Sequence, residues 1–109
     1  MKAAFIDQHG PAETIRVGEL AEPRPGPGEV LVKVGASSFN PIDLYLRAGT
    51  VAMPMSFPYV VGCDLAGTVV QAAPGGRFRE GDRVWGSNQG LLGRQGTTAE
   101  LVAVAEEWL

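Results

Sequence analysis

The chain has 109 residues, of which 45% are hydrophobic and 19% are charged, and its formal net charge is −3 at pH 7. This composition is typical of one globular domain and excludes a disordered chain, and the negative charge argues against a domain that binds nucleic acid. The apolar start is too short for a signal peptide, and no apolar run approaches the ~20 residues of a membrane span, so we expect a cytoplasmic protein.

The 15 glycines and 8 prolines exclude a helical bundle and favour short strands joined by turns. The first two strands are expected at residues 2–7 and 15–20. In the second of these, Ile15, Val17 and Glu19 alternate with other residues. This period of two predicts a half-buried strand with Ile15 and Val17 on the covered face and Glu19 at its rim.

A rigid surface connector is expected at residues 22–29, because three prolines and two glycines in eight residues cannot form a regular element. The strongest strand signal follows at residues 30–36. In this strand Val30, Val32 and Val34 face one way, which predicts a buried face.

A short helix of about two turns is predicted after that strand. Asn40 suits the N-cap and Pro41 the first helical position. Asp43 stands at the third position, where a carboxylate meets the positive end of the helix dipole. Gly49 suits the residue just beyond the helix, so the helix should end before it.

Residues 51–61 are apolar but contain Pro54 and Pro58, so an irregular covering loop is expected there rather than the interior of a strand. The remaining strands are expected at residues 62–72, 83–86 and 98–104, and the first two of these should pair as a hairpin. Six or seven clustered strands with one short helix predict a mainly β fold, either a small barrel or a sandwich. They argue against a doubly wound sheet.

Three features could carry chemistry but have simpler explanations. Residues 90–96 are rich in glycine, yet they lack the G-x-G-x-x-G spacing and the strand–turn–helix context of a phosphate loop, which favours a hairpin loop. Cys63 beside Asp64 could be a reactive thiol or a metal-ligand pair, but a small buried cysteine is favoured. His9 in a turn is best explained as solvated. One cysteine and one histidine exclude an intrachain disulfide and a four-ligand structural zinc site.

Asn40 and Tyr45 are the strongest candidates for a binding role. Asn40 lies at the mouth of the predicted helix, where backbone amides favour negatively charged ligand groups, although capping alone would explain it. Tyr45 could instead be an aromatic side chain packed on the barrel. The two residues are five positions apart, which is more than one helical turn, so they need not share a face.

Five segments occur in an order that points to one family. They are residues 28–34 (GEVLVKV), 39–43 (FNPID), 58–69 (PYVVGCDLAGTV), 81–84 (GDRV) and 96–102 (GTTAELV). Together they span nearly the whole chain and resemble the N-terminal part of the medium-chain dehydrogenases/reductases. Within that family the chain is most similar to the zinc-independent quinone oxidoreductase branch, the zeta-crystallin-like enzymes.

Two positions carry the resemblance to this branch. Zinc alcohol dehydrogenases have a ligand cysteine where this chain has Asn40, and Gly-His-Glu where it has Gly62, Cys63 and Asp64. The cysteine-rich structural zinc lobe of those enzymes is absent too. The resemblance therefore implies an enzyme without zinc.

The resemblance implies that residues 1–109 form a GroES-like domain, a partly open β-barrel on the substrate side of a cleft. A Rossmann-type domain that binds most of the NADPH is then expected after residue 109. Asn40 and Tyr45 would approach the nicotinamide end of NADPH, and the loop at residues 51–59 would line the substrate side.

The implied reaction is hydride transfer from NADPH to a quinone or to an activated enone or enal. The oxygen that develops negative charge needs a donor, which could be the Tyr45 hydroxyl, the Asn40 amide or an ordered water. The chain alone is expected to be inactive, and the full-length enzyme to be a homodimer that acts on a small molecule. Two alternatives stay open: a stand-alone, non-catalytic GroES-like oligomerisation module, and a zinc alcohol dehydrogenase.

Overall fold

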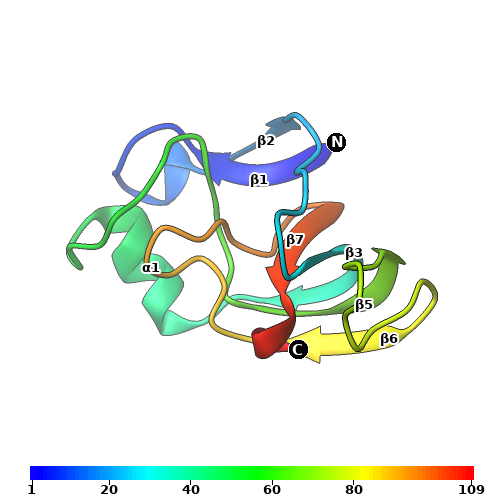
Figure 1. The fold of residues 1–109 in the computed structure, drawn as a ribbon. Helices are drawn as coiled ribbons and strands as arrows, with labels where there is room; N and C mark the ends of the chain where they lie inside the picture. The colour runs from blue at the N-terminus through cyan, green and yellow to red at the C-terminus, as the bar shows by residue number, and fades with distance from the viewer.

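The computed structural model describes residues 1–109, which form two antiparallel sheets and one short α-helix (Figure 1). The first sheet contains, in order, β2 (Arg16–Glu19), β1 (Lys2–Ile6) and β4 (Tyr59–Val60). The second contains β6 (Arg83–Gly86), β5 (Asp64–Gln71), β3 (Glu29–Ser38) and β7 (Leu101–Ala105). A single isolated β-bridge, between Ala3 and Ala99, joins the two sheets. The strands therefore form no continuous ring, and the barrel is partly open. The predicted mainly β, partly open architecture is confirmed.

The larger core lies on the inner face of the second sheet. Val30 and Val32 of β3 are fully buried, and Val34 is half-buried at the edge of the same cluster. The other buried members come from all the remaining strands of this sheet and the turn after β5: Leu65, Val69, Ala73, Val84, Val102 and Val104. The alternation predicted for this strand is therefore confirmed, and burial of these side chains holds the sheet together at about 1.5–3 kcal/mol each.

Helix α1 (Pro41–Ala48) has the predicted bounds and lies at one end of the molecule, directly after β3 (Figure 1). Asn40 is its N-cap residue, and the backbone N–H of Asn40 donates to Asp43 Oδ2 at 2.7 Å. Gly49 has φ of 80°, a left-handed conformation that glycine adopts at low cost, and its N–H donates to the carbonyls of Tyr45 and Leu46. Leu46 is fully buried and anchors the helix to the first sheet.

The predicted covered face of β2 was wrong at Val17, which is 73% exposed because it lies on the solvent face of the strand. Ile15, just before β2, is half-buried as predicted. The half-buried position of this strand is Gly18, where an added Cβ would lie 3.4 Å from the Phe5 ring. The alternation of apolar residues therefore misidentified the covered face. The covered position is Gly18, whose lack of a side chain leaves room for the Phe5 ring.

The irregular loop predicted at residues 51–61 was correct only in part. Tyr59 and Val60 form β4, which pairs with Ile6 and Phe5 of β1. Both prolines of the segment precede Tyr59, so its last residues are free to join a ladder. The rest is irregular and covers the second core cluster of Ile6, Leu46, Tyr59 and Val61 with the partly buried side chains of Val51, Met53 and Met55.

Two strand starts also differ from the prediction. β5 starts at Asp64 rather than at residue 62, because Gly62 has φ of 109° and lies outside extended geometry. β7 starts at Leu101 rather than at residue 98 and ends at Ala105. β6 has the predicted bounds and pairs with β5 as the expected hairpin. None of the helices has both the length and the apolar character needed to cross a membrane.

The last residues of the chain are held beside β6. They form a short 3-10 helix, η2 (Glu106–Trp108). The Arg77 guanidinium donates from Nη2 to the carbonyls of Glu106 and Leu109, both at 2.7 Å. A second 3-10 helix, η1 (Ala12–Thr14), lies between β1 and β2.

Candidate functional site

A hydrogen-bonded cluster lies where β3 ends and α1 begins. It consists of Ser38, Asn40 and Asp64, and we call it the Asn40–Asp64 cluster. Asn40 donates from Nδ2 to Asp64 Oδ2 at 2.7 Å, and the Ser38 hydroxyl donates to the same oxygen at 3.0 Å. The antiparallel register places Ser38 directly opposite Asp64, and the turn into α1 brings Asn40 beside them.

The Asp64 carboxylate fixes the orientation of the Asn40 amide. Because Nδ2 is engaged by Asp64, the amide oxygen Oδ1 points away from it; Oδ1 lies 3.4 Å from the Ser38 hydroxyl and faces the backbone N–H of Asp43 in the capping box. Asn40 is half-buried, so this oxygen is held on a side chain that cannot rotate freely. A fixed amide of this kind can recognise a polar group, such as another carboxamide, at low entropic cost.

Tyr45 lies on the same helix but is not brought together with Asn40. Its side chain is 53% exposed, and its hydroxyl makes no hydrogen bond within the chain. Five helical positions rotate a side chain by about 140° from its starting direction. Asn40 and Tyr45 therefore share a helix and no contact, and only a ligand that spans the mouth and one side of α1 could touch both.

Three ionisable groups behind the cluster are buried. Desolvation raises the pKa of the Asp43 carboxyl, although the backbone amides of Asn40 and Gly62 oppose this shift. Burial also raises the pKa of the Cys63 thiol, which favours its neutral form, and the predicted small buried cysteine is confirmed. The pKa of Tyr59 is raised mainly by burial, and its hydroxyl donates to the Gly90 carbonyl at 2.9 Å.

Residues 90–96 form a loop, as expected, but not a hairpin loop, because the strands it connects, β6 and β7, lie at opposite edges of the second sheet. The N–H of Gly90 donates to the Gln95 carbonyl, that of Arg94 to Leu91 and that of Gly96 to Val60. These amides are engaged within the chain and so do not form a cradle for a phosphate. His9 is exposed, as predicted, and its ring lies edge-on to Phe57 with 5.3 Å between centroids.

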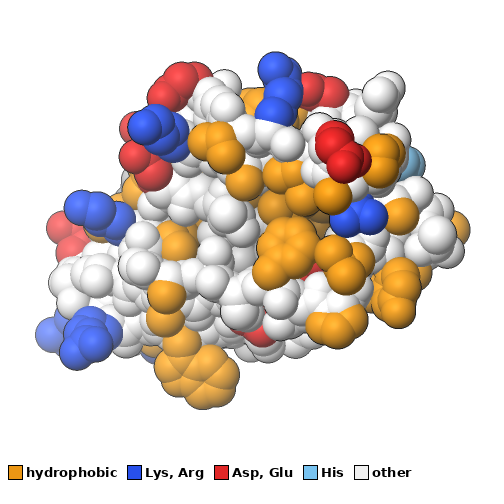
Figure 2. All heavy atoms as spheres, turned by 180° about the vertical axis from the view of Figure 1, so that it is seen from behind, with side chains coloured by type: hydrophobic (Ala, Val, Ile, Leu, Met, Phe, Trp, Pro, Cys, Tyr) orange, Lys and Arg blue, Asp and Glu red, His pale blue; other side chains and the backbone are white.

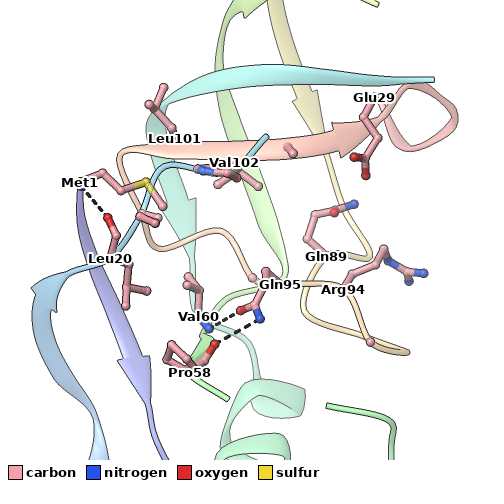
Figure 3. A pocket seen from close by; sticks show the side chains of 16 residues that line it. Met1, Leu20, Glu29, Pro58, Val60, Gln89, Arg94, Gln95, Leu101 and Val102 are labelled. Carbon is pink, nitrogen blue, oxygen red and sulfur yellow. Dashed lines mark hydrogen bonds between the residues drawn. The ribbon is translucent and has the colours of Figure 1, made fainter. Parts of the chain in front are cut away.

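A pocket of about 510 Å³ lies between β1, β7 and the segment at residues 93–96 (Figure 3). Gln95, on its floor, accepts from the Val60 N–H at 2.7 Å and donates to the Pro58 carbonyl at 3.2 Å. Sequence analysis missed Gln95, because nothing in the local pattern shows that residue 95 pairs with β4. Neither Asn40 nor Tyr45 lines this pocket, so it is separate from the candidate site.

A shallow hollow adjoins the Asn40–Asp64 cluster. Ser38, Asp64 and the edge strand β6 line it, and Trp85 of β6 is 77% exposed there. On the face turned away from Figure 1, hydrophobic side chains gather across the middle, with charged ones around the upper and left margins (Figure 2). The large hydrophobic side chains that are exposed are Val17, Phe39, Leu44, Tyr45, Phe57, Val70, Trp85 and Leu92.

Comparison with known proteins identifies the family. The alcohol dehydrogenase GroES-like domain matches residues 26–109. The chain belongs to this domain family. The resemblance to the medium-chain dehydrogenases/reductases is thereby confirmed, and so is the GroES-like fold.

Two curated relatives are similar over most of the chain. Dehydrogenase orsE of Emericella nidulans is 38% identical over 86 residues, which are 78% of this chain and 24% of that protein. A quinone oxidoreductase of Rattus norvegicus is 33% identical over 87 residues, which are 78% of this chain and 26% of that protein. The GroES-like chain therefore spans about a quarter of the length of these relatives.

Solved structures match nearly the whole chain. An alcohol dehydrogenase superfamily protein from Novosphingobium aromaticivorans has a TM-score of 0.85 at 39% identity, over 99% of this chain and 33% of that one. A mycobacterial protein complexed with NADPH has a TM-score of 0.85 at 30% identity, over 99% and 32%. A cobalt- and zinc-bound alcohol dehydrogenase from Pyrobaculum aerophilum has a TM-score of 0.87 at 29% identity, over 98% and 39%.

Proposed function

We propose that this chain is the N-terminal, substrate-side domain of an NADPH-dependent oxidoreductase that transfers hydride to a quinone or to an activated enone or enal. A Rossmann-type domain that binds most of the cofactor would follow residue 109, and the whole enzyme would be a homodimer. The relatives named quinone oxidoreductase and the neighbour complexed with NADPH support this proposal. The observation that carries it is the 2.7 Å bond from Asn40 to Asp64, which holds one amide in a fixed orientation at the mouth of α1.

In this proposal Asn40 and Tyr45 hold the nicotinamide end of NADPH. NADPH supplies the hydride when it is bound. The orienting role falls to the Asn40 amide, whose Oδ1 makes a 3.4 Å contact with the Ser38 hydroxyl and would accept from the carboxamide in its place. The Tyr45 hydroxyl, exposed and without a partner in the chain, would donate to the oxygen of the acceptor as negative charge develops on it.

The donor atoms near Asn40 do not fit a catalytic zinc. No three His, Cys, Asp or Glu side chains are grouped so that they could hold a metal ion. Zinc binds cysteine as the thiolate, yet burial raises the pKa of Cys63 and favours its thiol. Asp64 already accepts from Asn40 and Ser38. These features support a zinc-free reaction over that of a zinc alcohol dehydrogenase.

The test is NADPH binding by the full-length protein and its Asn40→Ala and Tyr45→Phe variants. Loss of one hydrogen bond costs about 0.5–1.5 kcal/mol, which corresponds to about a 2- to 13-fold increase in Kd. We expect an increase in this range for Asn40→Ala, and a fall in kcat/KM with a quinone for Tyr45→Phe.

Gln71→Ala is the matched control, since it removes an exposed side-chain amide at the end of β5 and should leave Kd unchanged. If both site variants bind and turn over NADPH like the unmodified enzyme, the assignment of Asn40 and Tyr45 is wrong. If the full-length protein does not bind NADPH at all, the oxidoreductase proposal fails and the oligomerisation module becomes the better explanation.

A further inference from the structure

Asp43 is buried to an unusual degree for a carboxylate at the start of a helix. Its residue exposure is 1%, and the ion pairs within the chain join the N-terminus to Glu19 and Arg16 to Asp7, so no cation neutralises Asp43. One carboxylate oxygen, Oδ1, is buried without a hydrogen-bond partner. A carboxylate buried without a partner cation destabilises the fold, and a capping role at a helix surface does not require burial.

Asp43 is bonded to the main chain of Asn40 in the Asn40–Asp64 cluster. Its Oδ2 accepts from the backbone N–H of Asn40 at 2.7 Å. On its other side the backbone amide of Gly62 lies close enough to lower the pKa of its carboxyl.

Two bonds therefore hold Asn40. Asp43 fixes its main chain, and the Asp64 side chain fixes its amide. We propose that Asp43 is a positioning residue: its buried carboxylate braces the N-terminus of α1 so that the Asn40 amide meets its ligand in one orientation. This inference rests on the proposed role of Asn40 in NADPH binding.

The test compares Asp43→Ala with Asp82→Ala in the full-length protein. Asp82 is a matched control, because its Oδ2 accepts from the N–H of Arg79 at 2.8 Å, again three residues earlier, in a turn far from the cluster in sequence. Both variants lose a bond of the same kind, and their Tm values report that structural loss. Only Asp43→Ala should raise the Kd for NADPH.

The size of the effect has an upper bound. Asp43 acts through Asn40, so Asp43→Ala should raise Kd by no more than Asn40→Ala does, which is about 2- to 13-fold. Asp43→Asn keeps an oxygen for the Asn40 N–H but places an NH₂ group or a neutral oxygen at Gly62. It should therefore recover part of the affinity that Asp43→Ala loses.

A double-mutant cycle separates positioning from general destabilisation. In the Asn40→Ala background the backbone N–H of residue 40 remains but the positioned amide is gone. Asp43→Ala should then change Kd less than about twofold, while its effect on Tm should be the same as in the unmodified background. If Asp43→Ala changes Kd equally in both backgrounds, or leaves Kd unchanged in the protein that retains Asn40, the positioning role of Asp43 is wrong.

One outcome concerns the proposed function instead. If Asn40→Ala alone leaves the Kd for NADPH unchanged, the role of Asn40 fails, and a crystal structure of the Asp43→Ala protein decides the brace by itself. The brace predicts that the 2.7 Å separation of Asn40 Nδ2 and Asp64 Oδ2 lengthens beyond hydrogen-bonding distance. An unchanged separation would contradict it.

Discussion

The pairing of β3 with β5 positions the candidate site. Within this pairing, Gly67 is the residue at which an added side chain would be tolerated least. Val34 of β3 lies opposite Gly67 of β5. A Cβ added at Gly67 would lie 2.2 Å from the Lys33 carbonyl oxygen and 2.8 Å from Val32 Cγ1. The carbonyl is backbone in the middle of a ladder, so no side-chain rotation relieves the clash, and the two strands must separate.

We expect Gly67→Ala to lower the free energy of unfolding by about 3 kcal/mol, the upper end of the range for overpacked cores. This is a large part of the roughly 5–15 kcal/mol that stabilises a typical domain. At about 4–8 °C per kcal/mol, Tm should fall by at least about 12 °C. Urea unfolding monitored by circular dichroism measures the change, and a constant m value would show that the midpoint reports stability.

Gly35→Ala provides the control within the same pair of strands. A Cβ at Gly35 would lie 3.6 Å from the Ala66 carbonyl oxygen, an ordinary van der Waals distance. Replacing glycine where the backbone allows it restricts the unfolded chain and stabilises by about 0.4–1 kcal/mol. If Gly67→Ala costs less than about 1 kcal/mol, or if Gly35→Ala costs as much as Gly67→Ala, close packing of β3 on β5 does not account for these glycines.

Two further predictions follow from buried ionisable groups. Desolvation raises the pKa of Asp43 above its unfolded value, so between the two values the native state binds more protons and its stability falls as pH rises. The asparagine of Asp43→Asn cannot ionise, so the stability of this variant should not fall in the same way. The unfolding free energy of the variant minus that of the unmodified chain should therefore increase from acid to neutral pH, and a difference independent of pH would refute this. Cys63, buried with a raised pKa, should react with a disulfide reagent at pH 7 on the order of tenfold more slowly in the native chain than in urea, and equal rates would show that it is accessible.

The sequence predicted correctly those helices and strands whose limits and buried faces are determined by residues close to them in the chain. The bounds of α1 follow from Asn40, Pro41 and Gly49, which act within one turn of the helix ends. The buried face of β3 follows from alternating valines. Val17 shows the limit of such signals, because alternation does not tell which face of a strand the rest of the fold covers, and Val17 lies on the face left in solvent.

The candidate site could be predicted only in part. The assignment of Asn40 and Tyr45 stays a prediction, and the sequence did not reveal their surroundings: the partner of Asn40 is 24 positions away at Asp64, and Ser38 is 26 positions from that carboxylate. The burial of Asp43 was not foreseen, since an aspartate at the third position of a helix normally faces solvent. The Gly62 amide and the Asp64 carboxylate, which affect its pKa, come from a distant part of the chain.

The second of two register shifts between β3 and β5 decides which side chains meet in the cluster. Val32 pairs with Val69 and Val34 with Gly67, but beyond Gly35 the register shifts by one residue, so Ala36 pairs with Ala66 and Ser38 with Asp64. Without this bulge Ser38 would lie opposite Cys63, and Asp64 would turn to the other face of the sheet, away from Asn40. The fixed Asn40 amide thus depends on a bulge at Gly35, five residues earlier. A glycine inside a strand is a signal for a bulge, but it does not show which residues of the partner strand the shifted register brings together.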